Sequence, residues 1–144
     1  MSFIRFIWDK KGVHKTYIDL EDDFEVTKNN TRETLIYGSL AIEELCFYLY
    51  KKYIENNSNL TQSRLIKFRN MSFAEKVNSL EILGVIEFSC ANKMKDIKDV
   101  RNHAAHNLIF EDIIYKGKKM PEGLQKFKED CLELWEILNK KIES

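Results

Sequence analysis

Apolar residues recur along most of this chain with the period of an α-helix. Between about residues 31 and 56 they form two neighbouring stripes. The first stripe contains Leu35, Gly38, Ile42, Leu45, Leu49 and Tyr53, and the second contains Ile36, Leu40, Phe47 and Tyr50. We expect a long helix here, capped by Asn30 or Thr31. Because this helix is apolar over so much of its circumference, it is either central in a bundle or shared with another subunit.

Shorter helical segments are predicted after this helix, beyond a polar break at 56–59. In each of them apolar residues return at the spacing of a helix face. The segments cover 61–69, where the pattern is weakest, and then 72–83, 87–106 and 121–142. The inward positions of the last segment are Leu124, Phe127, Cys131, Leu134, Trp135 and Leu138.

Local signals mark the ends of these helices. Ser72 and Glu75 have the spacing of a capping box, in which each side chain satisfies a backbone N–H group of the first turn. Gly84 stands where a residue in the left-handed conformation commonly ends a helix. Pro121 suits the first turn of the last helix because proline has no N–H group to leave unpaired.

The first 30 residues have a different pattern. Phe3–Trp8 and Val13–Leu20 are rich in aromatic and β-branched residues, which predicts a β-hairpin, although an irregular arm would have the same composition. The stretch 109–119 is expected to be irregular or a short extended segment. The fold class is therefore all-α: a four- to five-helix bundle over 31–144 with a short N-terminal β-hairpin or extended arm over 1–30, one domain in all.

Composition supports a small helical domain and limits the partners. The 144 residues suit one domain, and 5 glycines and a single proline favour long helices over a many-turned β fold. Lys and Arg together number 23, as do Asp and Glu, so the formal net charge is zero. Neutrality argues against a tight general DNA binder, which is usually basic, but leaves room for transient contact with RNA.

The cysteines and the N-terminus bear on location. Cys46, Cys90 and Cys131 are odd in number and lack the spacing of a metal site, so we expect reduced, buried thiols. Charged residues come too early for a signal peptide, and no apolar run approaches the ~18 residues of a membrane span. We expect a soluble, cytoplasmic protein without membrane contact and without a cofactor.

The predicted helix over 87–106 contains the residues that are candidates for catalysis. Arg101 falls on its apolar face, where an isolated charge would cost several kcal/mol, so it needs a partner. Glu43 lies inside the second apolar stripe of the first helix and is the candidate, whereas Glu44 falls on a more exposed face. The other residues of the apolar face are Ile86, Cys90, Met94, Ile97, Val100, Ala104 and Leu108.

Asn102 and His106 are four residues apart and so share one face of this helix, beside Arg101. A guanidinium, an amide and an imidazole that converge without a metal suit phosphate chemistry. The imidazole would move a proton, the guanidinium would stabilise the charge of a phosphorane, and the amide would orient the substrate.

The pattern Arg101-Asn102-x-x-x-His106 resembles the R-x(4–6)-H motif of the HEPN superfamily, in which a polar residue often follows the arginine. The segment Gly38–Leu45 resembles the acidic part of the first HEPN helix, and Phe73–Ile86 resembles the step before the motif helix. The arrangement is most similar to the mannitol-operon repressor family and related small HEPN proteins. The resemblance covers roughly residues 31–140.

This resemblance implies a bundle that dimerises around the motif and often acts as a metal-independent endoribonuclease. It implies that Arg101 and His106 form the catalytic pair and that Asn102 assists. Toxin–antitoxin, defence or stress systems are the expected settings, with RNA as substrate and an antitoxin or regulatory protein as partner. We expect a homodimer whose interface includes the helices at 31–56 and 87–106. HEPN toxins paired with minimal nucleotidyltransferases carry a tyrosine where Leu108 stands, so regulation by AMP transfer is not expected.

An alternative is a non-catalytic HEPN regulator or scaffold that acts through protein contacts, with Arg101 and His106 in a packing network. Lys95, Lys98 and His103 are candidate RNA contacts, although a solvated face is the usual role of such residues. His103 and His106 are spaced like a metal pair but lack a clear third ligand, so no metal is expected. The aromatic residues Phe47, Tyr48, Tyr50 and Tyr53 fit a core or dimer interface better than a base-stacking platform.

Overall fold

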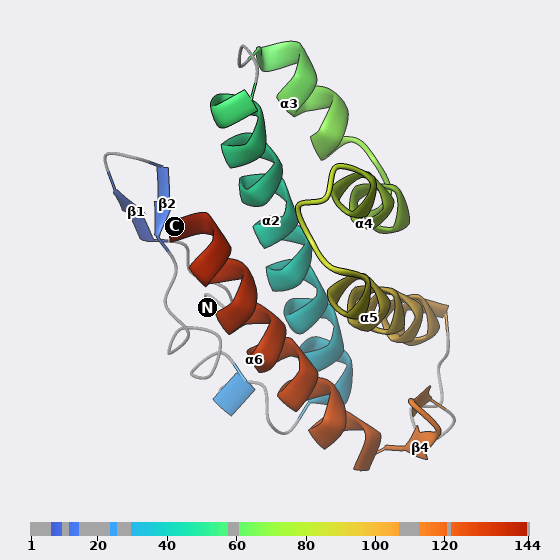
Figure 1. The fold of residues 1–144 in the computed structure, drawn as a ribbon. Helices are drawn as coiled ribbons and strands as arrows, with labels where there is room; N and C mark the ends of the chain where they lie inside the picture. Colours follow the sequence, from blue (N-terminus) through green and yellow to red (C-terminus); the bar gives the residue numbers. More distant parts are fainter. Residues whose placement is uncertain are drawn as a thin grey trace.

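A computed structural model describes residues 7–9, 12–14, 24–25, 30–57, 61–106, 113–120 and 122–143, without the side chains of 7–9, 12–14 and 106. Most of these residues are helical (Figure 1). The described residues form five longer helices: α2 (Thr31–Asn57), α3 (Gln62–Arg69), α4 (Phe73–Ile82), α5 (Phe88–His106) and α6 (Glu122–Glu143). The strands are β1 (Ile7–Asp9), β2 (Gly12–His14), β3 (Ile114–Tyr115) and β4 (Lys118–Lys119). The expected helical bundle is confirmed.

The long helix α2 is central. It packs against α3, α4, α5 and α6, and Figure 1 shows α6 along one side of it and α4 and α5 on the other. Leu35, Ile42 and Leu45 of the first apolar stripe are completely buried. The second stripe is only partly covered, and its Leu40 remains 43% exposed. The wide apolar surface of α2 was explained either by a central place in the bundle or by contact with another subunit. Packing within one chain therefore accounts for most of this apolar surface.

The packing of α6 against α2 depends on Gly38. A Cβ atom at this position would lie 2.8 Å from Cε1 of Phe127 and 3.2 Å from Sγ of Cys131. Both distances are below ordinary van der Waals contact, so a glycine is needed for the two helices to pack this tightly. All six inward positions predicted for α6 are buried, and Trp135 is the largest fully buried side chain.

The predicted helix ends at Asn30, Ser72 and Gly84 are observed, whereas Pro121, predicted to open the last helix, lies outside the described residues. The Oδ1 atom of Asn30 accepts a hydrogen bond from the backbone N–H of Glu33 at 3.0 Å, so Asn30 caps α2. Ser72 and Glu75 form both hydrogen bonds of the capping box at the start of α4. Gly84 adopts a φ of 76°, the left-handed conformation that follows a helix end.

The stretch expected to be irregular or extended contains a tight hairpin. Strands β3 and β4 pair antiparallel, and Lys116 and Gly117 between them have φ values of 50° and 78°. Two successive positive φ values are characteristic of a two-residue hairpin turn. The Tyr115 hydroxyl donates to Oδ2 of the buried Asp130 at 2.7 Å, and Nζ of Lys116 lies 2.8 Å from the same oxygen. These contacts fix the hairpin to α6.

At the N-terminus β1 and β2 also pair antiparallel, within the segment where the hairpin or arm was expected. The rest of that predicted arm lies outside the described residues, apart from Asn30 and a short helical piece at 24–25 in which Phe24 is buried. None of the helices in the described part of the chain has the length and apolar character needed to cross a membrane.

The cysteines are buried and have no disulfide partner, as expected. Burial raises the pKa of Cys46 to about 12, and it raises the pKa of Cys131 well above its usual range. A thiol with so high a pKa is protonated at neutral pH and is a poor nucleophile. These cysteines therefore act as small core residues.

Candidate functional site

Three helices contribute one charged side chain each to a single cluster. Nη1 of Arg101 on α5 donates to Oε1 of Glu43 on α2 at 2.7 Å. Nζ of Lys76 on α4 donates to the other carboxylate oxygen, Oε2, at 2.8 Å. The predicted pairing of Glu43 with Arg101 is confirmed. The weaker candidate, Glu44, pairs instead with Arg69 of α3.

The cluster runs from the interior of the bundle to its surface. The side chain of Lys76 is 6% exposed, that of Glu43 17% and that of Arg101 23%. The ring of Phe73 lies beneath the guanidinium, with its centroid 5.1 Å from the Arg101 Cζ atom. Two cations and one carboxylate give the cluster a formal charge of +1. Arg101 is its outermost member and presents that charge to solvent.

The carboxylate of Glu43 contacts both cations of this cluster. Burial alone would raise the pKa of Glu43, but the hydrogen bonds and charges of Lys76 and Arg101 outweigh burial and hold the pKa below its ordinary value. Glu43 is therefore ionised at neutral pH. A carboxylate with a lowered pKa that accepts from two cations is a structural anchor and a poor proton donor or acceptor.

Sequence reasoning missed Lys76, although the signal was present. Lys76 lies on the same face of α4 as Phe73, Val77 and Leu80, and all four are buried. A charged residue among apolar neighbours at helical spacing needs a partner, which is the argument that found Arg101. Applied to the 72–83 helix, it would have identified Lys76 as a second cation in need of a carboxylate.

The remaining motif residues lie in the last turns of α5. Asn102 and His103 are exposed, whereas Ala104 is completely buried against the core. His106 is the last residue of α5, and its side chain lies outside the described residues, as does the whole of Leu108. The structure thus joins Arg101 to Glu43 and places Asn102 at the adjacent surface, and it does not describe the imidazole of His106.

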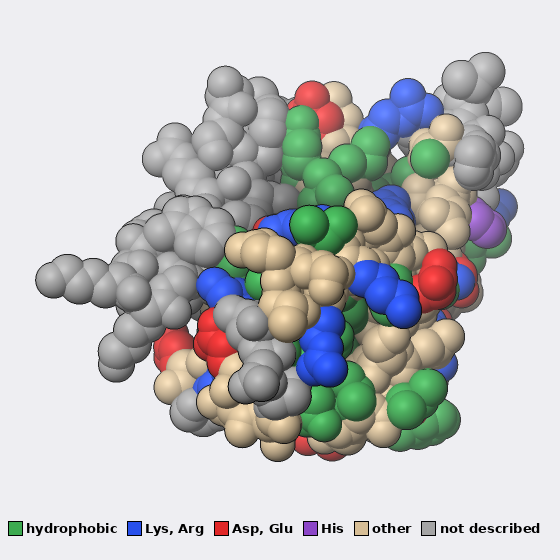
Figure 2. Space-filling model, turned by 90° about the horizontal axis from the view of Figure 1, so that it is seen from above, with side chains coloured by type: hydrophobic (Ala, Val, Ile, Leu, Met, Phe, Trp, Pro, Cys, Tyr) green, Lys and Arg blue, Asp and Glu red, His purple; other side chains and the backbone are tan. Residues whose placement is uncertain are grey.

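The lysines considered as RNA contacts have acidic neighbours. Nζ of Lys95 lies 3.7 Å from Oε1 of Glu81, and Nζ of Lys98 lies 2.9 Å from Oδ1 of Asp99. At 100° per residue, Lys95, Lys98 and Asn102 share one face of α5. On the face of the molecule drawn in Figure 2, Lys and Arg side chains are interspersed with acidic and neutral ones. The acidic partners Glu81 and Asp99 balance the charges of Lys95 and Lys98 on their face of α5.

The aromatic residues of α2 pack within the bundle. Tyr50 stacks on Phe68 of α3, with 4.3 Å between ring centroids. Phe47 lies beneath Arg69, whose Cζ atom is 3.8 Å from the ring centroid, and contacts the edge of Tyr48. These contacts join α2 to α3, in agreement with a packing role.

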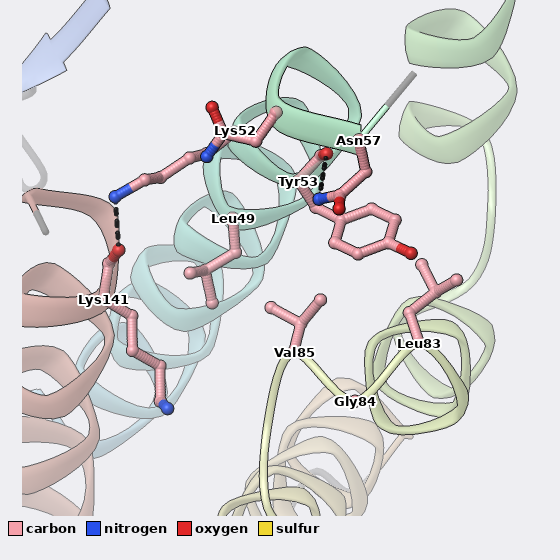
Figure 3. A pocket seen from close by; sticks show the side chains of 9 residues that line it. Leu49, Lys52, Tyr53, Asn57, Leu83, Gly84, Val85 and Lys141 are labelled. Carbon is pink, nitrogen blue, oxygen red and sulfur yellow. Dashed lines mark hydrogen bonds between the residues drawn. The ribbon is translucent and has the colours of Figure 1, made fainter.

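A separate pocket of about 220 Å³ lies where the ends of α2 and α6 meet the turn between α4 and α5 (Figure 3). Its apolar lining includes Leu49 and Val85. Nζ of Lys52 donates to the backbone carbonyl oxygens of Lys141 and Ile142 at 2.9 Å, and Nζ of Lys141 donates to Glu87 at 2.9 Å. Both ammonium groups thus connect helix ends. None of the predicted site residues lines this pocket.

Comparison with protein families, curated proteins and solved structures gives no match to this chain.

Proposed function

We propose that this chain is a HEPN-type domain that cleaves RNA without a metal ion, with Arg101, Asn102 and His106 as its catalytic residues. The observation that carries the proposal is the position of Arg101. Its guanidinium is fixed by Glu43 at the outer edge of a cluster with a formal charge of +1, in the same helix turn as the exposed Asn102. A fixed cation at the surface is suited to hold a phosphate group.

The proposed reaction is an internal transesterification. The ribose 2′-oxygen attacks the adjacent phosphorus, the new O2′–P bond forms, and the P–O5′ bond breaks. The products are a 2′,3′-cyclic phosphate and a free 5′-hydroxyl. The proton lost by the 2′-hydroxyl is taken up by a base and returned to the O5′ leaving group, and we assign this proton movement to His106.

The other two residues act on the phosphate. Arg101 binds the non-bridging oxygens, whose negative charge increases as the phosphorane forms. Asn102 orients the substrate by hydrogen bonding. Because the geometry of Arg101 is already set by Glu43, little reorganisation is needed when the phosphate arrives. DNA lacks the 2′-hydroxyl and is not cleaved in this scheme.

The proposal includes a homodimer in which α2 and α5 contribute to the interface. Support comes from the large apolar side chains that these helices leave exposed, Leu40 on α2 and Phe88 on α5. In this setting the protein acts in toxin–antitoxin control, defence or stress response, and an antitoxin or regulatory protein restrains it. Lys95, Lys98 and His103 guide the RNA toward the motif.

The test is an RNA cleavage assay in the presence of EDTA. The parent protein should cut single-stranded RNA, and His106→Ala should lower the rate by roughly 10²-fold or more while the fold is kept. His14→Ala is the control, since it removes a histidine of β2, outside the motif helix and outside the proposed RNA contacts. Arg101→Gln should also abolish cleavage. If the parent cuts no RNA, or if His106→Ala cuts as fast as the parent, the catalytic assignment is wrong.

A second candidate is a non-catalytic regulator that acts through protein contacts. It is favoured by the exposed apolar side chains of Ile82, Leu83 and Phe88, which flank the turn between α4 and α5. In this case the cluster of Glu43 and Arg101 serves only to hold α5 against α2. A folded parent that leaves every tested RNA intact would favour this function.

A further inference from the structure

We infer that Lys76 is a positioning residue whose charge offsets Glu43 and so leaves Arg101 able to bind an anionic phosphate group. This inference rests on the proposed function and adds to it a residue outside the motif. The ligand of the cluster formed by Glu43, Lys76 and Arg101 is a phosphate group of a ribonucleic acid.

Arg101 and Lys76 share one carboxylate. Oε1 of Glu43 accepts from Arg101 at 2.7 Å and Oε2 accepts from Lys76 at 2.8 Å. A lone Glu43–Arg101 pair would be neutral, and repulsion of an incoming phosphate by the carboxylate would offset a large part of its attraction to the guanidinium. With Lys76 present the sum is +1, and the guanidinium is both fixed and electrostatically available.

The two cations of the cluster differ in burial. Lys76 is almost completely enclosed, so its ammonium group faces Glu43 and does not reach a ligand in solvent. Arg101 is the more exposed cation, and it donates to Glu43 through one terminal nitrogen. A guanidinium carries five N–H donors in a fork, so a phosphate can be bound by others of them. The buried lysine therefore supplies charge, and the arginine supplies contact.

Neither the packing of α4 nor the pairing of Glu43 requires a lysine at position 76. A methionine of similar length would fill the same space on the apolar face of α4, and burying a charge there is costly. Glu43 would still be paired, because Arg101 would remain. Lys76 is thus not needed to satisfy Glu43, and its charge calls for another role.

The experiment measures binding of a short RNA in which every 2′-hydroxyl is replaced by a methoxy group. Such an RNA cannot undergo the proposed reaction, so fluorescence anisotropy at low salt reports binding alone. Lys76→Met should weaken binding about tenfold, since the cluster becomes neutral. Lys76→Arg keeps the charge and should bind within about threefold of the parent.

A double variant separates charge from structure. Glu43→Gln together with Lys76→Met leaves Arg101 as the sole charge of the cluster, so the sum returns to +1. Because the guanidinium also loses the carboxylate that fixes it, binding should recover in part, to about threefold tighter than that of Lys76→Met. Lys93→Met is the matched control. This variant also removes a lysine with an acidic partner, because Lys93 of α5 pairs with Glu133 of α6, and it should leave binding unchanged.

The outcomes are distinct. Equal binding by the parent and Lys76→Met overturns the inference, and so does a double variant that binds as weakly as Lys76→Met, because the lysine would then act through structure. A parent that does not bind the methoxy RNA also overturns it. The expected binding pattern in a parent that does not cleave ordinary RNA in EDTA rejects the ribonuclease and retains the phosphate site.

Discussion

Nη1 of Arg101 lies 2.7 Å from Oε1 of Glu43, although 58 residues separate them in the chain. The contact joins the motif helix α5 to the central helix α2. It also sets the position of the guanidinium, because the carboxylate is itself held by Lys76. The stability of the bundle and the geometry of the candidate site therefore depend on the same carboxylate.

Glu43→Gln should lower the free energy of unfolding by about 1–3 kcal/mol, because two partly or fully buried cations lose their counter-charge. Urea denaturation of the parent and the variant checks this. Glu44→Gln is the control, since Glu44 is the neighbouring residue and pairs with the more exposed Arg69. Its cost should stay below about 1 kcal/mol. Equal stability of Glu43→Gln and the parent would show that the cluster does not stabilise the fold.

Low pH should remove the contribution of Glu43 to the free energy of unfolding. Its pKa in the folded protein is lower than the ordinary value of 4.5, so its stabilising contribution is fully present above pH 4.5 and is lost as the pH falls through the lowered folded pKa. The difference in unfolding free energy between the parent and Glu43→Gln should therefore be largest near neutral pH and should shrink below pH 4.5. Urea titrations at a series of pH values measure it. A difference that grows as the pH falls would mean that the pKa is raised.

Gly38→Ala should destabilise the bundle by about 1–3 kcal/mol, although alanine is the better helix former. The new Cβ atom would lie 2.8 Å from the Phe127 ring, so α2 and α6 would have to separate or the ring would have to move. Thermal unfolding measures the effect. Combining Gly38→Ala with Phe127→Leu should cost less than the sum of the two single changes, because the smaller side chain relieves the clash. If the two changes in unfolding free energy are simply additive, the contact with the Phe127 ring is not the source of the destabilisation.

The homodimer remains a prediction. Light scattering at micromolar concentration should give the mass of two chains, and Leu40→Glu should shift it toward one chain, since the substitution puts a charge on the exposed apolar part of α2. Ile66→Glu on α3 is the control, because it changes another exposed apolar residue outside the proposed interface. A parent that is monomeric under these conditions contradicts the prediction.

Local chemistry determined much of this fold from the sequence alone. The caps at Asn30 and Ser72 and the turn at Gly84 depend on residues a few positions apart, so their pattern can be read directly from the chain. Periodicity likewise identified the inward face of α6. The need of Arg101 for a carboxylate followed from its place on an apolar face, and Glu43 followed from the same argument.

Only the tertiary structure decided how these pieces meet. The sequence left open whether α2 is central or shared with another subunit, and packing against four helices now covers most of it. It gave no sign that Asp130 fixes the β3–β4 hairpin through Tyr115 and Lys116. The helical pattern marks Lys76 as a buried cation in need of a carboxylate, but only the structure shows that this carboxylate is Glu43, shared with Arg101. The physical reason is that such contacts depend on the distances between helices, which the packing of the whole core sets and no local pattern encodes.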